Sequence, residues 1–455
     1  MQPATHFSRA RDYSRARFRS TSLGLCLLAI TTAAFCADDE PAMVPDEKTD
    51  APTPNGLAAA SAKLHEWGVT GSLRGAYWSS NRRVDDEDHL LNTSLWLKLD
   101  RKIIKNWGVF IEGYLNSEAP FGDHKNTNRV REAYVEGRLA DWDFRLGKQI
   151  IAWGRADRFN PTDNLTPRDF TLLAPEIDED RFGSVAAKAA WNWNSSTSLT
   201  AVWVPIFRPH VFAFPEQAGV SFSHDIPDSR RQWALKLDQS GKAVDWSVSY
   251  YNGLDLMPDI SFGGLAPGGI VAQISHHRVR VIGGDAATSF GAYRFAVELA
   301  HTRTEDADGN NPSIKNPYWF GVLGVERTFV DNLSLNTQFF VRRVDHYADP
   351  ESIADPTVRA WAVQNAILNN QYDKQQYGLT MRIGKKWLNE TLEGELAGSL
   401  LLNRSGYLVR PKLIYAANDS LKLIAGVEYF SGSDKTSYGR QEKNRGVFAE
   451  ARYFF

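Results

Sequence analysis

The sequence predicts an all-β protein, a closed antiparallel β-barrel that crosses a membrane with about eighteen strands, sixteen being the alternative. Three observations lead to this fold class. Apolar and polar residues alternate with a period of two over most of the chain, which is typical of strands with two different faces. Stretches of helical periodicity are few and short. Long and short connections alternate between the predicted strands, as they do when one end of a barrel carries only short turns.

The segment "HLLNTSLWLKLDR", residues 89–101, shows the alternation clearly. Leu91 and Leu97 fall on one face of the predicted strand, whereas Lys98 and Asp100 fall on the other. In lipid every backbone donor and acceptor needs a partner within the protein, so a closed barrel with an apolar outside and a polar lumen satisfies this pattern.

The chain from residue 66 onward divides into strands separated by turn-forming residues, and the connections decide the architecture. Long connections follow every odd-numbered strand, except for the short "NRS" near residue 403. A helix is predicted over Pro356–Leu368, inside one long connection. The predicted strands are 66–80, 89–101, 106–117, 129–140, 142–153, 182–193, 197–206, 230–239, 243–253, 274–284, 290–303, 317–328, 332–344, 375–386, 391–402, 405–416, 420–431 and 445–455.

The N-terminal region carries the pattern of an export signal. Arginines are frequent before an apolar stretch that ends at Cys36, and acidic residues follow at once. Residues 1–36 are therefore predicted to be a signal peptide, with lipid attachment at Cys36 as the alternative. Residues 37–65 are rich in Asp, Glu and Pro and are predicted to be a disordered acidic lead-in. Residues 66–455 form the predicted barrel.

The final residues, "GVFAEARYFF", alternate like a strand and finish on aromatic side chains. This segment resembles the last strand of Gram-negative outer-membrane β-barrel proteins, which commonly ends in Phe with an aromatic residue two positions earlier. Phe455 and Tyr453 occupy these positions, whereas Glu450 stands where that class often has a small residue. The size and strand number resemble large porins and the eighteen-stranded alginate-export type of channel.

The resemblance implies a location and several partners. It places the barrel in the outer membrane of a Gram-negative bacterium and the lead-in in the periplasm, and it makes Tyr453 and Phe455 the signal for the barrel-assembly machinery. The surrounding partners would be outer-membrane lipid and lipopolysaccharide. The net charge of -2 gives no reason to expect a nucleic-acid partner.

Many basic residues fall on the predicted lumen face, where rings of Arg and Lys favour the passage of anions. The alternative is a salt-bridged wall that supports the barrel and selects little. The predicted pathway residues are Arg145, Arg155, Arg158, Arg168, Arg278, Arg280, Arg294, Arg342 and Arg382.

The connection over residues 154–181 is long, highly charged and contains three prolines, Pro161, Pro167 and Pro175. Prolines and Asp-rich turns favour a compact, ordered loop. In position this loop resembles the third loop of general porins, which folds inward as a constriction. The alternative is an ordinary surface loop.

These features predict an outer-membrane channel, either a porin or an export pore, that passes polar solutes, with anions favoured, or polysaccharide. The alternatives are a structural or adhesive barrel plugged by its loops and, less favoured, a lipid-active barrel enzyme. No catalytic residue, metal site or cofactor is predicted, since Ser275, His276 and His277 show no nucleophile or metal-ligand spacing. General porins are often trimers and alginate-export channels are monomers, so the resemblance leaves the oligomeric state open.

Overall fold

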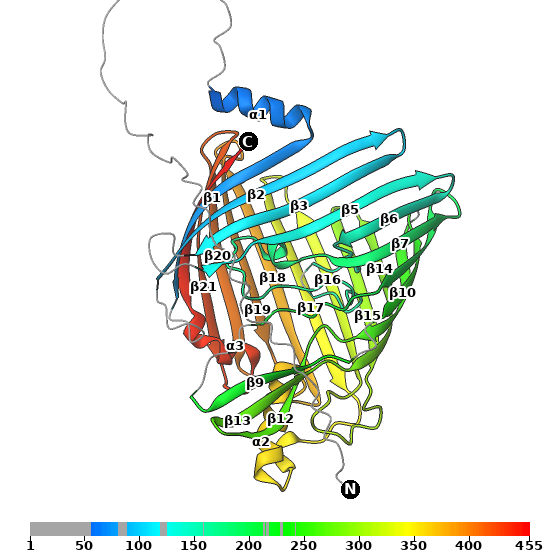
Figure 1. Cartoon of the computed structure of the whole chain (residues 1–455), viewed down its shortest axis with the longest axis vertical. Coiled ribbons are helices and arrows are strands. Elements are labelled where there is room, and N and C mark those ends of the chain that lie inside the picture. The colour runs from blue at the N-terminus through cyan, green and yellow to red at the C-terminus, as the bar shows by residue number, and fades with distance from the viewer. Residues whose placement is uncertain are drawn as a thin grey trace, which may run out of the picture. The chain divides into compact units, whose positions relative to one another are not determined.

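The computed structural model describes residues 56–80, 89–118, 125–157, 159–212, 214, 218–227, 231–241 and 243–455. Within this part of the chain, a sheet of nineteen strands curves around a central space (Figure 1). Strand β4 (Lys125–Asn126) has two residues and pairs only with the end of β3. The other eighteen strands close into an antiparallel barrel, which confirms the predicted fold class and favours eighteen strands over sixteen.

The barrel strands follow one another around the wall in chain order. They are β1 (Val69–Ser80), β2 (His89–Ile104), β3 (Trp107–Glu118), β5 (Arg129–Leu139), β6 (Trp142–Gln149), β7 (Ser184–Asn192), β8 (Thr197–Val204), β10 (Gln232–Gln239), β11 (Asp245–Leu254), β14 (Arg278–Phe290), β15 (Tyr293–Arg303), β16 (Tyr318–Thr328), β17 (Leu333–Val344), β18 (Gln375–Trp387), β19 (Leu392–Leu401), β20 (Gly406–Ala416), β21 (Leu421–Gly432) and β22 (Gly446–Phe454).

The barrel closes where β1 meets β22. Their register pairs Ser72 with Phe454, and the backbone of Gly71 exchanges hydrogen bonds of 3.0 and 3.1 Å with the backbone of Phe455. The ring of Phe455 covers Gly71 on the outer face, because a Cβ atom on Gly71 would lie 2.6 Å from that ring. The C-terminal segment therefore seals the sheet edge that an open barrel would expose.

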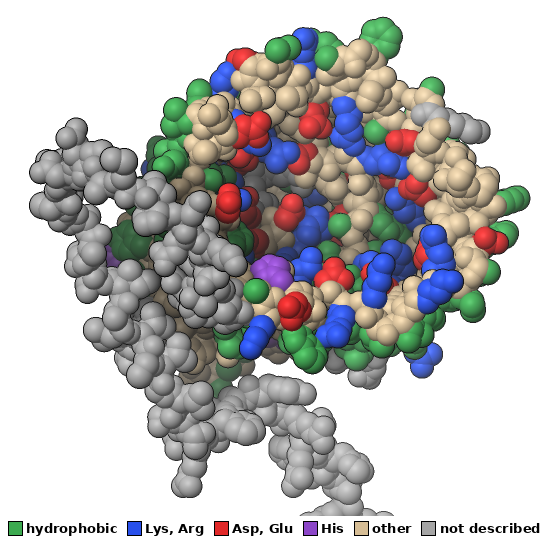
Figure 2. Space-filling view, turned by 90° about the horizontal axis from the view of Figure 1, so that it is seen from above, with side chains coloured by type: hydrophobic (Ala, Val, Ile, Leu, Met, Phe, Trp, Pro, Cys, Tyr) green, Lys and Arg blue, Asp and Glu red, His purple; other side chains and the backbone are tan. Residues whose placement is uncertain are grey.

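The two faces of the wall differ in chemistry as the alternation predicts. In β2, Asn92 and Ser94 are buried toward the lumen, whereas Leu91 and Leu97 are exposed on the outside. Viewed along the barrel, Lys, Arg, Asp and Glu side chains gather inside and hydrophobic side chains project from the outer rim (Figure 2). Exposed apolar residues on the outer face include Leu73, Leu115, Trp142, Trp203, Trp233, Leu299, Leu323, Leu413 and Tyr453.

The two ends of the barrel carry different connections, as predicted. One end has short turns, for example Lys105–Asn106, and the other has long loops, with the short connection 402–405 as the exception. We call these the short-turn end and the long-loop end. Two predicted boundaries are wrong: the strand 142–153 ends at Gln149, and the strand 274–284 is β14, which runs from Arg278 to Phe290. Residues 285–289, expected to form a short turn, therefore lie in a strand.

Further elements lie outside the barrel wall. Strands β9 (Val220–Asp225), β12 (Asp259–Ala266) and β13 (Gly269–Ser275) form a separate sheet at the long-loop end, beside α2 (Pro356–Leu368) (Figure 1). This sheet was not predicted, because its β13–β9 pairing is parallel and joins two different loops. The remaining short elements are α3 (Ser437–Arg440), η1 (Ile177–Asp180), η2 (Pro350–Ser352) and η3 (Glu442–Asn444).

Helix α2 confirms the predicted helix with the same bounds. Asp355 caps it by accepting hydrogen bonds from the backbone N–H groups of Thr357 and Val358, and Pro356 occupies the first turn, where its missing N–H costs nothing. No helix among the described residues is both long and apolar enough to span a membrane.

Helix α1 (Gly56–Glu66) occupies a segment that we expected to be disordered up to residue 65. Its alanine-rich sequence favours a helix. We missed this helix because we judged residues 37–65 together by their content of Asp, Glu and Pro. The predicted signal peptide, residues 1–36, and the first part of the lead-in, residues 37–55, lie outside the described residues.

Replacing Gly71 with Ala should weaken closure of the barrel. The new Cβ would lie 2.8 Å from the backbone oxygen of Trp96, which cannot move aside as the Phe455 ring can, so we expect a loss of roughly 1–3 kcal/mol in the free energy of unfolding. The measurement is urea-induced unfolding of the refolded barrel. Gly75→Ala is the matched control in the same strand, because no atom lies within 4 Å of its added Cβ. Equal stability of the two variants would contradict this account of closure.

Candidate functional site

The connection between β6 and β7, residues 150–183, folds into the barrel, and we call it the inward loop. Its residues contact wall strands on opposite sides of the lumen, from β14 and β15 to β20, β22 and β1. The structure thus agrees with the inward alternative for this loop rather than with an ordinary surface loop. How the loop is held determines the space that remains inside the barrel.

One anchor is Glu298, which projects from β15 and is 1% exposed. Its carboxyl group accepts hydrogen bonds from the backbone N–H groups of Arg155 and Ala156 and, at 3.4 Å, from the hydroxyl of Thr162. Gly154 precedes them with a φ of +101°, and a Cβ there would lie 2.6 Å from Glu298 Oε1. Glycine is thus the residue that lets the loop backbone approach this carboxyl group.

Side chains of the loop add ion pairs on the same side of the lumen. The guanidinium of Arg155 lies 2.6 Å from Asp285 on β14 and 3.1 Å from Asp238 on β10. Two residues later, Asp157 pairs with Arg382 of β18 at 3.0 Å. The loop therefore binds four strands of this wall within three consecutive residues.

The far part of the loop is held by cations of the opposite wall. Glu176 pairs with Lys412 of β20 at 3.0 Å. Glu179 lies between Arg74 of β1 at 2.8 Å and Arg452 of β22 at 3.1 Å. These ion pairs span the seam where the barrel closes, so closure and loop position support each other.

A β-bulge in β5 supplies a third set of contacts. The register with β3 shifts between Glu112 and Gly113, which leaves Arg131 extra in the pairing. Arg131 donates to the backbone oxygens of Arg181 at 3.0 Å and Asp178 at 3.2 Å. It also pairs with Glu112. The bulge therefore turns Arg131 inward, where it binds the last part of the inward loop before β7.

Apolar contacts fill the space between the inward loop and the wall. Ile151, Trp153 and Leu165 form a buried cluster with residues of β7, β8, β10, β11, β14 and β15. Elsewhere Leu173 packs near Trp78 of β1, and Phe159 packs against residues of β16 and β17. Apolar packing therefore fills these parts of the interface between the inward loop and the wall.

One polar cavity remains between the inward loop and β15–β18. It has a volume of about 170 Å³ and is open at its margins. Arg294 and Arg382 line it with side chains that are 44% and 47% exposed, and Arg294 lies 3.4 Å from Glu326. The remaining lining residues are Arg155, Ala156, Asp157, Ala296, Gly324, Val325, Asn336 and Gln338. Three cations and two carboxylates thus face a space large enough for a few water molecules or a small polar solute.

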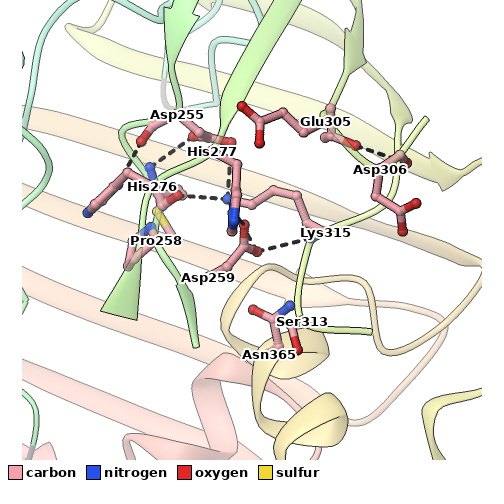
Figure 3. A network of polar contacts seen from close by, with 12 residues as sticks. Asp255, Pro258, Asp259, His276, His277, Glu305, Asp306, Ser313, Lys315 and Asn365 are labelled. Atoms are coloured by element: carbon pink, nitrogen blue, oxygen red, sulfur yellow. Dashed lines mark hydrogen bonds and ion pairs between the residues drawn. The ribbon is translucent and has the colours of Figure 1, made fainter. Parts of the chain in front are cut away.

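A buried polar network fixes the loops at the long-loop end (Figure 3). The ammonium of Lys315 lies 3.0 Å from Asp255 and donates to the backbone oxygen of Met257 at 2.7 Å. Burial opposes the charge of Lys315, but the carboxylates of Asp255 and Asp259 outweigh it and raise its pKa. Asp259 also lies 2.8 Å from His277 Nδ1. The network keeps the loop before β14 and the loop before β16 in place above the lumen.

A second loop reaches the inward loop through His210. Its Nδ1 accepts a 2.8 Å hydrogen bond from the backbone N–H of Arg168, and its ring lies edge-on to Phe170. Burial lowers the pKa of His210 to about 3, a shift that nearby Asp255 opposes and Arg168 reinforces. His210 is therefore neutral at ordinary pH, the form that can accept this bond.

The charged side chains of the cavity lie in pairs, Arg294 with Glu326 and Arg382 with Asp157. The described residues contain no group of three or more His, Cys, Asp or Glu that could hold a metal ion.

Comparison with known proteins places the chain in a family. A family model described as "Protein of unknown function (DUF1302)" matches residues 55–429. The chain belongs to the DUF1302 family. A search of proteins with curated function gives no match for it.

Solved structures of outer-membrane channels resemble this DUF1302 barrel in fold. OpdK of Pseudomonas aeruginosa, solved with vanillate, is 9% identical, with 85% of this chain and 98% of that chain covered at a TM-score of 0.51. OccAB3 of Acinetobacter baumannii is 9% identical, with 85% and 98% covered at 0.49. OccK11 of P. aeruginosa is 12% identical, with 85% and 95% covered at 0.47. The DUF1302 barrel is thus porin-like, and these likenesses show nothing about its solute.

The structure brings several predicted pathway residues of the DUF1302 barrel together. Arg155, Arg294 and Arg382 line the cavity. Arg145 faces the lumen but pairs with Glu136 at 2.7 Å. These contacts agree in part with the salt-bridged wall that we held as the alternative.

Three further predicted residues lie elsewhere. Arg168 is inside the inward loop, paired with Asp180 at 2.8 Å. Arg342 donates to the backbone oxygen of Asn369 at 2.8 Å, near the long-loop end. Arg158 lies outside the described residues.

Arg278 and Arg280 are not lumen residues, contrary to our expectation. The buried residues of β14 are the odd-numbered Val279 and Val281, which pack beneath the inward loop, so the even-numbered arginines point outward. Our placement of these arginines in the lumen implied that the valines between them face outward. The error arose because the inner wall is apolar where the loop covers it.

Sequence reasoning also missed functional residues. Arg74 follows the alternation of β1 and could have been found from Ser72 and Trp78 on the same face. Arg131 lies in a β-bulge that interrupts the alternation, so the sequence pattern did not indicate that its side chain faces the lumen. Asp285 was assigned to a turn, because the end of β14 was placed too early.

Removing the carboxyl group of Glu298 should release the inward loop. Glu298→Ala loses three hydrogen bonds, roughly 2–4 kcal/mol of anchoring, so we expect larger single-channel conductance and faster tryptic cleavage at Arg155. Glu136→Ala is the matched control, since Glu136 is a lumen-facing carboxylate outside the cavity lining that pairs with Arg145 of the wall rather than with the loop backbone. Unchanged conductance and cleavage in Glu298→Ala would show that this anchor does not hold the loop.

Acidification should weaken the hydrogen bond that His210 accepts from the backbone N–H of Arg168 in the inward loop. The pKa of His210 is lowered when the loop is docked, so docking is fully favoured above the ordinary value of 6.5 and weakens as pH falls from 6.5 toward 3. Hydrogen exchange at the Arg168 amide, corrected for its intrinsic pH dependence, should therefore accelerate on acidification. His210→Phe should remove this response, whereas substitution of the exposed His224 by Gln should retain it. A response that persists in His210→Phe would assign it to another group.

Proposed function

We propose that this DUF1302 protein is an outer-membrane channel that passes small polar solutes, with anions favoured, through the gap between the inward loop and β15–β18. The observation that carries the proposal is the polar cavity at this gap, with exposed Arg294 and Arg382, inside a closed barrel whose outer face is apolar. The porin-like fold supports the membrane location, and the resemblance of Tyr453 and Phe455 to a barrel-assembly signal agrees with it.

The charge distribution supports a preference for anions. Three arginines and two carboxylates line the cavity, so the lining carries one excess positive charge. Focusing of the field by low-dielectric walls increases the effect of even one such charge on passing ions. The preference is expected to be modest because Asp157 and Glu326 lie beside the arginines.

The width of the passage supports small solutes over a polymer. The inward loop is anchored on β1, β14, β15, β18, β20 and β22, and a polymer would require these anchors to open. The same anchors favour the second candidate, a structural barrel plugged by its loop. The two candidates differ in conductance.

Single-channel recording in planar bilayers, with reversal potentials in a salt gradient, tests the proposal. The wild type should conduct and favour chloride over potassium, and Arg294→Gln with Arg382→Gln should shift the preference toward cations because two positive charges leave the constriction. Lys385→Gln is a control that removes an outward-facing charge. A correctly inserted barrel that carries no current, even with residues 155–180 deleted, would refute the channel.

A further inference from the structure

The outer face of the barrel carries a group of arginines at the long-loop end that the channel does not use. Arg280 on β14, Arg303 on β15 and Arg343 on β17 are exposed and belong to the outward-facing set of their strands. Within the described part of the chain, none of the three side chains forms a hydrogen bond or ion pair. We call these residues the outer arginine cluster.

The register brings two of these charges directly together. Arg280 and Arg303 are Cα partners across the β14–β15 pair, where directly opposite side chains start about 4.5–5.5 Å apart. Like charges in this position repel each other and weaken the sheet. An anion bound between them would convert this repulsion into attraction, and the fork geometry of arginine suits a phosphate group.

The height of the cluster on the wall matches a lipid headgroup layer. From Tyr293 at the short-turn end to Arg303, β15 rises about 26 Å for a strand tilted by roughly 40°, close to the apolar band of about 25 Å on such barrels. Trp319 pairs directly with Arg343, and its ring lies 4.6 Å from that of His301 at a tilt of 39°, at a position expected for an interfacial aromatic girdle. The arginines thus lie where the acyl region ends.

Nearby acids do not neutralise the cluster. Glu305 accepts a hydrogen bond from the backbone N–H of Arg278 at 2.9 Å, and Asp345 lies 3.0 Å from His301. Exposed Arg231, just before β10, adds a further cation on the same side of the barrel. Among the described outward-facing strand residues at this end of β14–β17, the arginines therefore leave an excess of positive charge.

We propose that the outer arginine cluster binds the phosphate groups of a phosphorylated glycolipid in the outer leaflet. This inference rests on the membrane position in the proposed function but not on conductance. The long-loop end of such barrels faces the cell exterior, so the cluster meets the outer leaflet, whose glycolipid carries phosphate on its sugar headgroup. Arg280 and Arg303 bind one phosphate between them, and Arg343 contacts the headgroup two strands away.

The test is native mass spectrometry of the folded full chain released from detergent, titrated with bisphosphorylated lipid A. The wild type should retain this glycolipid, and Arg280→Gln with Arg303→Gln should weaken binding by at least roughly tenfold, as expected for loss of a charge-assisted contact. Arg101→Gln with Lys385→Gln removes two outward-facing charges at the short-turn end and should leave binding unchanged. Heat-modifiable gel migration verifies that each variant forms its barrel.

The other lipids and ions identify the occupant. Dephosphorylated lipid A should bind weakly. The proposal would be overturned if phosphatidylglycerol bound as tightly as lipid A, or if inorganic phosphate at the concentration of lipid A displaced it. Equal affinity of the wild type and the Arg280/Arg303 variant for lipid A would also overturn it. So would a dimer in which a second copy of the chain covers this face. Conductance of the same samples separates the two proposals: a conducting variant that binds lipid A normally refutes only the lipid site, and a lipid-binding wild type without current refutes only the channel.

Discussion

The interior of this barrel depends on how the inward loop is held across the lumen. Without that loop, eighteen strands would enclose a wide aqueous space. Hydrogen bonds to Glu298 and ion pairs from Arg155 and Asp157 hold the loop on one wall, and Glu176 and Glu179 hold it on the other. The gap that remains is defined by these contacts rather than by the diameter of the barrel.

The anchors also link the loop to the closure of the sheet. Glu179 contacts Arg74 and Arg452, which belong to the two strands that meet at the seam. Loss of one partner from a partly buried ion pair of this kind destabilises the fold, because the desolvation of the remaining charge is no longer offset by its attraction to the partner. Loop docking and barrel closure are therefore expected to form together, with Gly71 and Phe455 sealing the same seam from outside.

The sequence could predict most of the wall and less of the lumen. Alternation placed all eighteen strands, and helical periodicity over Pro356–Leu368 located a helix inside a loop. The alternation assigned residues to the wrong face of a strand where the inward loop makes the inner wall apolar. Val279 and Val281 are apolar yet face inward, because the inward loop covers them, so Arg278 and Arg280 were placed on the wrong face. The bulge that turns Arg131 inward, and the pairing of β13 with β9, depend on contacts distant in sequence.

The central claim is that ions pass between the inward loop and β15–β18. Its most direct test uses the Asn336→Cys variant, because Asn336 lines the cavity. An anionic methanethiosulfonate reagent is added during single-channel recording to modify this cysteine. The only native cysteines, Cys26 and Cys36, are replaced by alanine for this purpose. The account predicts a stepwise loss of most of the current on modification, because a bulky sulfonate would fill the gap. Complete modification, verified by mass spectrometry, with unchanged current would show that ions take another route and would contradict the claim.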